Sequence, residues 1–366
     1  MQITIQRDHL LKPLSFVAGV AERRQTLPIL SNVLVQCREG RLTLTGTDLE
    51  VEVVVNVEGA GGSECAFTVP ARKLLDICRA LPTEATLDIR LDKGKATIRS
   101  GRSRFTLLTM PATDFPSIET TQWDWALQVP QRVLGRLLQK TQFCMAQQDV
   151  RYYLNGLLLE ITDGKLTSVA TDGHRMALGE VTLEHGVSGI RQGILPRKGV
   201  LEVSRFLEDL EEEVELKGGT NHIRIVKKDL TFTSKLIDGR FPDYHKVIPQ
   251  EQQIRIRVGR DLFRESLSRV AILSNEKYRG VRVALAPGVM RLTAHNPEQE
   301  EAQEELSIDY SGDEFEIGFN VNYIIEAVSA IDAAEAEMGL SDSNSSCVLY
   351  APGDARNRYV VMPMRL

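Results

Sequence analysis

Apolar residues follow two spacings along this chain, and the two spacings alternate from one end to the other. In residues 131–145 they recur every three or four positions, as at Leu134, Leu137 and Leu138, which is the spacing of one helix face. Six segments have this character and are expected to form helices: 8–24, 72–79, 131–140, 197–209, 260–279 and 321–332. Alternation and β-branched residues predict strands at 42–44, 51–57, 86–91, 96–99, 223–226 and 315–319.

Three residues bear on the helix boundaries. Asp8 and Asp261 are expected at the N-termini of their helices, where a carboxylate can accept hydrogen bonds from free backbone amides. Pro13 falls inside the first helix, where it removes one backbone hydrogen bond and lowers the stability of the helix.

A ten-residue motif occurs three times. Residues 39–48 (EGRLTLTGTD) return as 163–172 (DGKLTSVATD) and, more weakly, as 287–296 (PGVMRLTAHN), about 124 residues apart each time. Three copies of one α+β domain, each with two helices packed on antiparallel sheet, account for this period. The expected domains are 1–122, 123–246 and 247–366. Other segments recur at nearly the same period: 69–73 with 195–198, and 105–116 with 232–242 and 359–366.

The net charge of −6 argues against a polyanionic partner until its distribution is considered. The six expected helices contain about 17 Lys and Arg against about 11 Asp and Glu, so the acidic excess lies in the remaining chain. Arg132, Arg136 and Lys140 recur every fourth residue and therefore stand on one helix face. A basic helical layer suits a phosphate-rich partner. Solvated helix faces would give the same composition, and the two interpretations are evenly matched.

The sequence contains no recognisable constellation for metal or cofactor binding. The five cysteines are widely spaced without a CxxC pair, and the six histidines form no HExxH motif, so we expect buried reduced thiols, no metal and no cofactor. There is no phosphate-binding loop, no GxGxxG and no GxSxG. Neither a signal peptide nor an apolar stretch of membrane length is found, and we expect a cytoplasmic protein.

Asp172 and His174 lie close together in a segment that could suggest catalysis. The matching positions of the first copy, residues 47–50, contain no histidine. A repeated Thr-Asp turn is more often structural, with the aspartate bonding nearby backbone amides. We therefore predict a structural turn at residues 171–175 rather than a catalytic site.

Nine segments, in one order from end to end, carry a resemblance to a known family. They are residues 9–14 (HLLKPL), 26–30 (TLPIL), 42–50 (LTLTGTDLE), 69–73 (VPARK), 148–156 (QDVRYYLNG), 169–175 (VATDGHR), 233–244 (TSKLIDGRFPDY), 272–280 (ILSNEKYRG) and 359–366 (YVVMPMRL). Over its whole length the chain resembles the beta subunits of bacterial DNA polymerase III, the sliding clamps. Members of that family are three-domain protomers that pair head to tail into a closed ring of six domains, with helices lining the hole.

The resemblance implies a non-enzymatic processivity factor. Such a homodimer encircles double-stranded DNA without reading its sequence, because phosphate contacts carry no sequence information. It tethers the replicative polymerase alpha subunit, the clamp-loader delta subunit and other proteins with a clamp-binding motif, and it has no membrane partner. The polymerase can then release the primer end and still stay at high effective concentration.

The resemblance also implies three sets of site residues. The DNA-facing set is Arg24, Arg72, Gln148, Tyr152, Tyr153, Arg197 and Lys198. The groove for partner peptides, between the second and third domains, is Leu154, Thr171, Gly173, His174, Arg175, Met176, Pro242, Val247, Tyr278, Asn320, Tyr323, Ser346, Val360, Val361, Met362, Pro363, Met364, Arg365 and Leu366. The seam between two protomers is Lys73, Arg102, Arg104, Phe105, Leu107, Ile272, Leu273, Glu300, Glu301 and Glu304.

Some of these residues also have plainer interpretations. One of Tyr152 and Tyr153 is expected to pack in the core, because adjacent residues of a strand point to opposite faces. Residues 360–362 also read as a last strand. Asn344, Lys246 and Gln303 depart from the residues usual at these positions, which would alter the groove or remove one seam ion pair.

Two other classes of protein are also considered. A monomeric scaffold of the same fold would leave Phe105, Leu107, Ile272 and Leu273 as exposed apolar edges, which argues against it. An enzyme acting at Asp172 and His174 would lose its reaction when His174 is replaced, whereas a clamp would only bind peptides more weakly.

Overall fold

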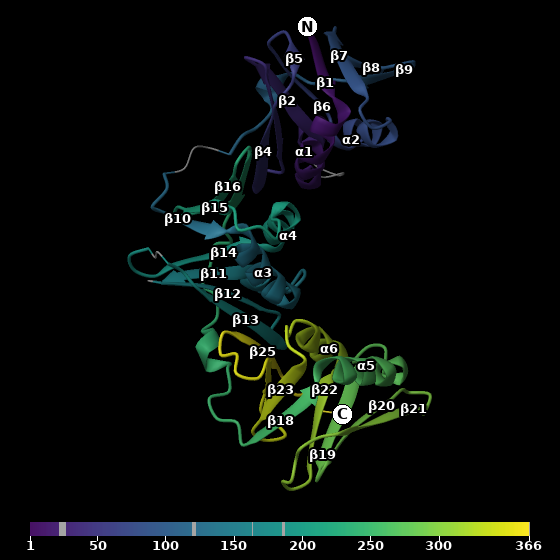
Figure 1. Cartoon of the computed structure of the whole chain (residues 1–366), viewed down its shortest axis with the longest axis vertical. Coiled ribbons are helices and arrows are strands. Elements are labelled where there is room, and N and C mark those ends of the chain that lie inside the picture. The colour runs from purple at the N-terminus through teal and green to yellow at the C-terminus, as the bar shows by residue number, and fades with distance from the viewer. Residues whose placement is uncertain (22–26, 119–121, 163, 185–186, 366) are drawn as a thin grey trace. The chain divides into compact units, whose positions relative to one another are not determined.

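A computed structural model gives the fold of residues 1–21, 27–118, 122–162, 164–184 and 187–365 (Figure 1). The chain divides into two compact units, which are described separately. The first contains Met1–Gly135 and Lys198–Ile237, and the second contains Arg136–Arg197 and Asp238–Leu366.

Each third of the chain contains two α-helices and a set of antiparallel strands. The first third comprises β1 (Gln2–Gln6), α1 (Arg7–Val20), β2 (Asn32–Arg38), β3 (Arg41–Thr47), β4 (Val51–Val57), β5 (Gly61–Gly62), β6 (Cys65–Pro70), α2 (Ala71–Ala80), β7 (Thr86–Asp92), β8 (Lys95–Ser100) and β9 (Ser103–Leu108). The second comprises β10 (Trp125–Pro130), α3 (Gln131–Thr141), β11 (Gly156–Thr162), β12 (Lys165–Thr171), β13 (Arg175–Thr182), β14 (Arg191–Pro196), α4 (Arg197–Phe206), β15 (Glu213–Gly218), β16 (His222–Lys227) and β17 (Leu230–Lys235).

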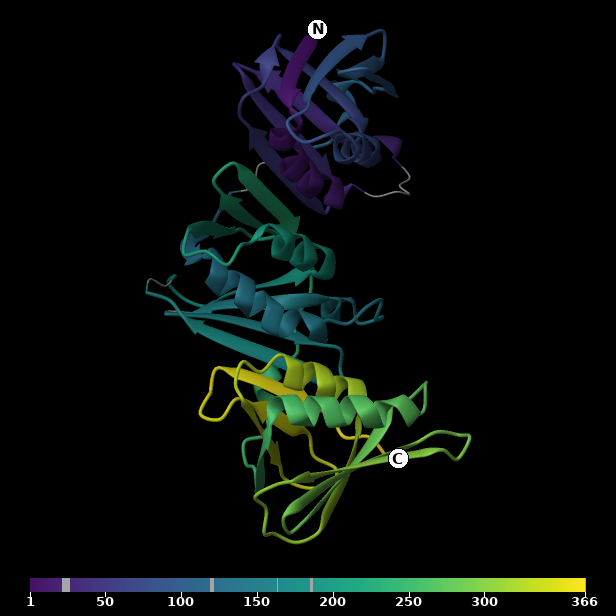
Figure 2. The same cartoon turned by 45° about the vertical axis from the view of Figure 1, so that its right-hand side comes forward.

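The last third repeats this order. It comprises β18 (Ile254–Gly259), α5 (Arg260–Val270), β19 (Gly280–Ala286), β20 (Val289–His295), β21 (Glu301–Ser307), β22 (Phe315–Asn320), α6 (Val321–Ser329), β23 (Glu335–Leu340), β24 (Cys347–Tyr350) and β25 (Asn357–Val361). In this third, α5 and α6 lie side by side across the strands (Figure 2). The six predicted strand segments all fall within observed strands, and the predicted α+β class is confirmed.

Three predicted helices end earlier than the apolar spacing suggested. The sixth, predicted to reach residue 332, ends at Ser329. The fourth, predicted to reach residue 209, ends at Phe206 because the carbonyls of Leu210 and Glu212 accept hydrogen bonds from the first amides of α3. The fifth, predicted to reach residue 279, ends at Val270. Residues Ala271–Leu273 tighten into a 3₁₀ turn, and the Ser274 hydroxyl then donates to the carbonyl of Ala271 at 2.8 Å.

The N-terminal aspartates and the proline are close to where they were predicted. Asp8 and Asp261 are each the second residue of a helix, so they act as first-turn acids rather than as caps. Pro13 lies inside α1, which still runs from Arg7 to Val20. The predicted end of this helix, at residue 24, falls outside the described residues.

Strand pairing joins neighbouring copies into continuous sheets. In the first unit, β4 pairs with β17 in an eight-stranded sheet of order β10-β15-β16-β17-β4-β3-β2-β6. In the second unit, β13 pairs with β25 in the order β14-β11-β12-β13-β25-β24-β23-β18. At both junctions, the strand that follows the Thr-Asp turn of one copy thus pairs with the last strand of the next copy.

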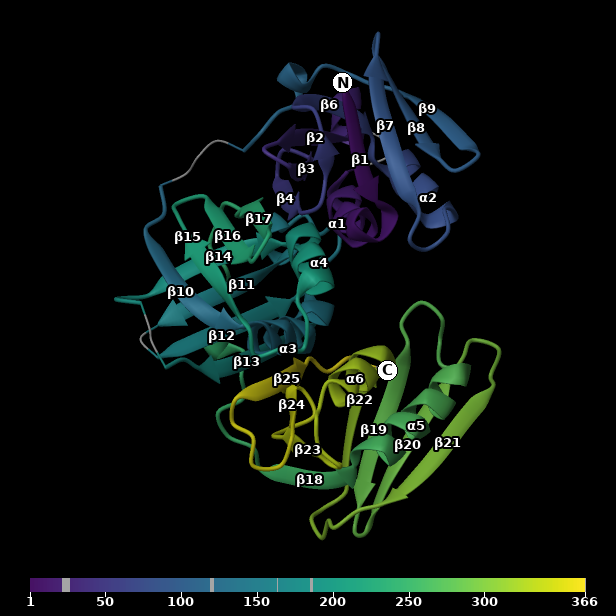
Figure 3. The same ribbon diagram turned by 45° about the horizontal axis from the view of Figure 1, so that its top comes forward.

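The last strand of each copy carries an aromatic residue, and the burial of this residue differs between strands that form a junction and the strand that does not. Phe232 in β17 and Tyr359 in β25 are fully buried at the two junctions. Their counterpart in β9 is Phe105, which is only half-buried. Strand β9 is the edge of its sheet, and β21 is likewise the edge of the order β21-β20-β19-β22 (Figure 3).

Candidate functional site

The segment Thr171–Arg175 forms a tight turn between β12 and β13. The Thr171 hydroxyl donates to the carbonyl of Arg175 at 2.6 Å and accepts the amide of Gly173 at 3.1 Å. One carboxylate oxygen of Asp172 accepts the amides of His174 and Arg175 at 2.9 and 3.1 Å. The predicted structural turn is therefore confirmed, because backbone amides occupy the acceptor that catalysis would require.

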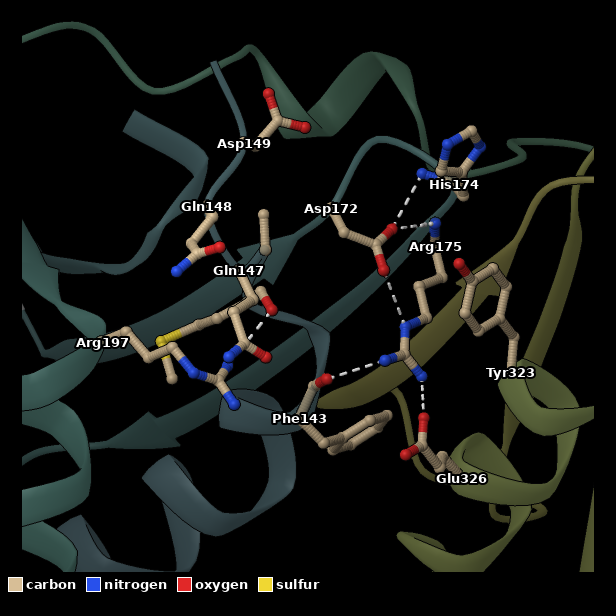
Figure 4. A pocket seen from close by; sticks show the side chains of 12 residues that line it. Phe143, Gln147, Gln148, Asp149, Asp172, His174, Arg175, Arg197, Tyr323 and Glu326 are labelled. Carbon is tan, nitrogen blue, oxygen red and sulfur yellow. Dashed lines mark hydrogen bonds and ion pairs between the residues drawn. The ribbon is translucent and has the colours of Figure 1, made fainter. Parts of the chain in front are cut away.

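Arg175 is nearly buried and uses its whole guanidinium within the chain. Nε donates to the second carboxylate oxygen of Asp172 at 3.0 Å, Nη2 donates to the carbonyl of Phe143 at 2.9 Å, and Nη1 pairs with Glu326 of α6. The guanidinium also lies over the ring of Tyr323, 4.4 Å from its centroid. Figure 4 shows this arrangement. Arg175 therefore supports the wall of the site instead of offering free donors.

A cavity of about 610 Å³ opens beside this arginine. It brings together Gln148 and Arg197 from the predicted DNA-facing set with His174, Arg175 and Tyr323 from the predicted groove. The remaining lining residues are Phe143, Met145, Ala146, Gln147, Asp149, Asp172 and Glu326. Two residues of the DNA-facing set therefore lie beside groove residues in this cavity, whereas Arg72 and Lys198 belong to the first unit.

The loop before β11 carries three of the predicted DNA-facing residues. Tyr152 and Tyr153 lie in a one-turn 3₁₀ helix, Tyr152–Leu154, so the expectation of a strand with opposite faces is wrong for this pair. Tyr152 is 58% exposed and Tyr153 is half-buried, with ring centroids 5.9 Å apart. Gln148 is exposed and adopts a left-handed conformation with φ +57°.

The other predicted DNA-facing residues differ in their surroundings. Arg72 is exposed on α2. Arg197 is half-buried, and its Nη1 donates to the carbonyl of Met145 at 3.3 Å. Lys198 donates to the carbonyl of Val20 at 3.0 Å and pairs with Asp48, so it is used within the first unit. Arg24 lies outside the described residues.

The predicted groove residues divide into a buried floor and an exposed rim. Leu154, Met176, Val360 and Val361 are buried, and the amide of Met362 donates to the carbonyl of His174 at 2.9 Å. Tyr278 and Met362 are 56% and 37% exposed. Val360 and Val361 thus belong to the last strand, and Met362 follows it. Leu366 falls outside the described residues, and the remaining positions are partly or fully exposed: Thr171, Gly173, His174, Arg175, Pro242, Val247, Asn320, Tyr323, Ser346, Pro363, Met364 and Arg365.

The three unusual residues are all exposed. Lys246 is paired with Asp243 at 3.2 Å. Asn344 lies in a turn in which its amide donates to the Asp342 carboxylate at 2.8 Å. Gln303 stands on the edge strand β21. None of the three side chains is buried, so the surrounding structure would tolerate a different residue at each position.

The predicted seam residues lie on the two free sheet edges or next to them. Ile272 is 75% exposed in the turn after α5. Leu107 is buried within its own sheet, and the exposed apolar residue of β9 is instead Leu108, which the sequence analysis missed. Glu304 pairs with Arg269 of the same chain, with contacts of 2.7 and 2.9 Å, so its charge is shared before any partner arrives.

The basic helix face is less open than the sequence suggested. Arg132 pairs with Glu211, and Lys140 pairs with Asp332 at 2.8 Å. Residues far apart in sequence supply these acids, which a count of charges per helix cannot reveal. Phe143, Glu326, Asp149 and Arg151 were missed for the same reason, since their roles depend on contacts across the fold.

A chain of three such domains, with sheets shared between neighbours, has the architecture of a DNA clamp. Three domain profiles of the DNA polymerase III beta subunit match it: N-terminal at residues 1–119, central at 128–243 and C-terminal at 245–365. The chain belongs to this family, the beta sliding clamps of bacteria. The domain boundaries predicted from the repeats, at 122 and 246, stay predictions.

Individual relatives agree over the full length. The beta sliding clamp of Pseudomonas putida is 51% identical over 367 residues, with all of both chains covered. That of Escherichia coli K12 is 47% identical over 372 residues, again with full coverage. The crystal structure of the DNA polymerase III subunit beta from Pseudomonas aeruginosa is 50% identical, covers both chains completely and superposes with a TM-score of 0.96.

Family membership fixes the general function. Sliding clamps are processivity factors rather than enzymes; they pair as dimers, encircle DNA and bind the polymerase and the clamp loader in the cytoplasm. Among the described residues, no helix is both long and apolar enough to cross a bilayer. Within the same residues, no group of His, Cys, Asp and Glu side chains is arranged to hold a metal ion.

Proposed function

We propose that two copies of this clamp close through β9 of one protomer and β21 of the other, and that the ring carries partners in the groove around His174 and DNA along Arg72, Gln148 and Tyr152. The observation that carries the seam assignment is the equivalence of three junctions. Strands β4 and β13 each pair with the last strand of the next copy. Strand β21 holds the same place in the third copy, and β9 is the one last strand left at a sheet edge.

The two formed junctions also predict the register of the third. Phe232 pairs with Val53, and Tyr359 pairs with Ala177. Each partner directly follows the residue that closes the turn of its own hairpin, which is Glu52 in β4 and Met176 in β13. In β21 the first pair is His295 with Glu301, so the equivalent position is Ala302. Phe105 should therefore face Ala302 of the partner subunit, and Arg104 should face Gln303 of the partner subunit.

This register explains two features of the seam. Phe105 would become as buried as Phe232 and Tyr359, which supplies an apolar driving force for closure. Arg104 would stand opposite a neutral residue, with Glu301 and Glu305 at the diagonal positions. Exposed ion pairs contribute only about 0–1 kcal/mol each, so a glutamine at 303 is compatible with closure.

Paired cysteines test the register directly. The double variant Phe105→Cys with Ala302→Cys should form an intermolecular disulfide on mild oxidation, because directly opposed residues bring their Cβ atoms close together. The five native cysteines are all buried and reduced, so they give little background. The matched control, Phe105→Cys with Gln303→Cys, places the thiols on opposite faces of the sheet. Cross-linking of the control in preference to the test pair would refute the register.

For the DNA face we propose phosphate contacts by exposed cations and polar side chains of α2 and the loop before β11. Arg72 is the clearest member because it is exposed on its helix. The Arg72→Ala ring should leave linear DNA faster, and the salt dependence of its binding should fall by about one phosphate contact. Retention on nicked circles, after loading by the matched loader, should stay unchanged. Equal loss from circles and linear DNA would mean that charge alone, not encirclement, holds the protein.

For the groove we propose an apolar peptide site with the buried floor of Leu154, Met176 and Val360 and the rim of Tyr278 and Met362. Such a site suits a short segment with aliphatic and aromatic anchors. A peptide from the matched polymerase alpha subunit should bind the wild-type ring and bind Met362→Asp at least about tenfold more weakly, because the new carboxylate would have to be desolvated. Unchanged affinity in that variant would remove Met362 from the site.

A further inference from the structure

Arg151 joins two segments that the proposed function assigns to different ligands. Its Nε and Nη2 donate to the two carboxylate oxygens of Asp149 at 3.0 and 2.9 Å. The same Nη2 donates to the main-chain carbonyl of Asp172 at 3.2 Å. One guanidinium thus connects the loop before β11 with the turn between β12 and β13, and its planar fork fits the carboxylate in two places at once.

Gly173 shows that this contact is built into the turn. A Cβ atom at position 173 would lie 2.8 and 2.9 Å from the two terminal nitrogens of Arg151, so the end of that side chain would have to shift. The positive φ favours glycine, but other residues can adopt it. The equivalent residue of the first copy is Leu49, which adopts φ +79° against φ +88° at Gly173. A side chain can therefore occupy this turn, although at a cost in strain, and at position 173 it would also displace the end of Arg151.

The loop that Arg151 holds is internally braced. The Asp149 amide donates to the side-chain oxygen of Asn155 at 2.9 Å, and the Asn155 amide group donates back to the carbonyl of Asp149 at 2.8 Å. The side chain of Val150 at the tip is 94% exposed, and Tyr152 follows it on the surface. These hydrogen bonds join Asp149 to Asn155, so the tip and Asp149 belong to one hydrogen-bonded segment.

The turn that receives Arg151 bears directly on the groove. Asp172, whose carbonyl accepts from Arg151, holds the amides of His174 and Arg175 with its carboxylate. His174 in turn accepts the amide of Met362 at its carbonyl. The contact of Arg151 is thus one residue away from the groove wall.

We propose that Arg151 is a positioning residue that couples the two sites, so that the ring binds partner peptides with a different affinity when duplex DNA passes through it. The inference rests on the proposed assignment of the loop to DNA and of the turn to partners. Contact between DNA and the loop tip shifts Asp149 and Arg151, and the Asp172 carbonyl transmits the shift to His174. By linkage, a peptide in the groove changes the hold on DNA by the same factor.

The test compares peptide affinity in two states of the ring. A fluorescent peptide from the matched polymerase alpha subunit is titrated against the free ring and against the ring loaded on a short duplex with blocked ends. In the wild type the two dissociation constants should differ about fivefold or more. In Arg151→Ala and in Gly173→Ala the ratio should fall to one. Equal affinities in the wild type, or a ratio that survives in Arg151→Ala, would overturn the coupling.

Two further variants separate positioning from charge and from general damage. Arg151→Lys keeps the charge but cannot form the two-pronged contact with Asp149, so its ratio should also fall to one. A ratio preserved in this variant would show that charge suffices and would refute the role of the fork. Leu49→Ala changes the same turn of the first copy, where it should leave the ratio at the wild-type value. Absence of any peptide binding or DNA retention in the wild type would instead count against the proposed function.

Discussion

The turns that precede β4 and β13 have the same backbone conformation, but different side chains surround them. Thr47 and Asp48 repeat the hydrogen bonds of Thr171 and Asp172: the hydroxyl donates to the carbonyl of Val51 at 2.9 Å, and the carboxylate accepts the amides of Glu50 and Val51. The backbone pattern therefore identifies the structural role. The residues after the aspartate differ: Leu49, Glu50 and Val51 stand where the second copy has Gly173, His174 and Arg175.

The second carboxylate oxygen shows the same contrast. In the first copy Asp48 takes the ammonium of Lys198, which also reaches the carbonyl of Val20 at the end of α1. In the second copy Asp172 takes Arg175, which reaches the carbonyl of Phe143 after α3. Both turns are thus tied to the end of a helix by a cation, and the second also borders the cavity beside Arg175.

The largest effect is expected from Arg175→Ala. It leaves the Asp172 carboxylate and the Phe143 carbonyl without their partner in a nearly buried place, which should lower the free energy of unfolding of the second unit by about 3 kcal/mol. Urea unfolding followed by the fluorescence of a probe in that unit measures it. A loss below about 1 kcal/mol would show that the network contributes little beyond surface pairing.

A smaller effect is expected at the first turn. Lys198→Ala removes the cation from Asp48, whose side chain is 6% exposed, although Lys198 itself keeps 29% of its surface in water. Because solvent screens the pair, we expect a loss of about 1–2 kcal/mol in the first unit, measured in the same way. Lys12→Ala, at a pair exposed on both sides, serves as the control and should change stability by less than about 0.5 kcal/mol. Equal losses in the two variants would contradict the special role of Lys198.

Exchanging the residue at the positive-φ position should change stability little in the first turn and more in the second. Leu49→Gly relieves a left-handed leucine but loosens the unfolded chain, so we expect a net change within about 1 kcal/mol and no effect on partners. Gly173→Leu should destabilise its turn more, since the new side chain meets Arg151. Thermal denaturation of both variants compares them, and a larger loss for Leu49→Gly would reverse the interpretation.

The finest test is the titration of Asp149, which has no counterpart in the first turn. Hydrogen bonds from Arg151 lower the pKa of the Asp149 carboxyl to about 2. The folded pKa lies below the ordinary value, so the contribution to stability is present above pH about 4 and is lost as the pH falls through about 2. NMR titration of the side-chain carboxyl carbon should show this midpoint, and Arg151→Ala should move it back toward the ordinary value. An unmoved midpoint would mean that Arg151 is not the cause.

Much of the fold could be predicted from the sequence, because the repeat and the apolar spacing are local properties. The three copies, all six helices and the hydrogen-bonded Thr-Asp turn follow from such patterns. The early end of α4 could not be predicted, since it depends on amides of α3 that lie about 80 residues away in sequence. The same holds for Glu326 and Phe143, which become part of the site only when the fold brings them to Arg175.

The candidate sites came mainly from family resemblance, and the structure refined their surroundings. Sequence spacing placed Arg132 and Lys140 on one face but could not show that Glu211 and Asp332 neutralise them. The apolar character of Leu108 was visible in the sequence. Its exposure was not, because alternation along β9 is interrupted by two successive leucines, of which only Leu107 turns inward.

In the closed ring, the domains are joined by antiparallel strand pairing in two ways: within one chain and between two chains. The pairings of β4 with β17 and of β13 with β25 form within one polypeptide, so dilution does not weaken them. The proposed joint between β9 and β21 would involve two molecules and would obey mass action. As the cellular concentration falls, a ring built in this way comes apart first at a place fixed by chain connectivity, and it releases whole, folded protomers that can be used again.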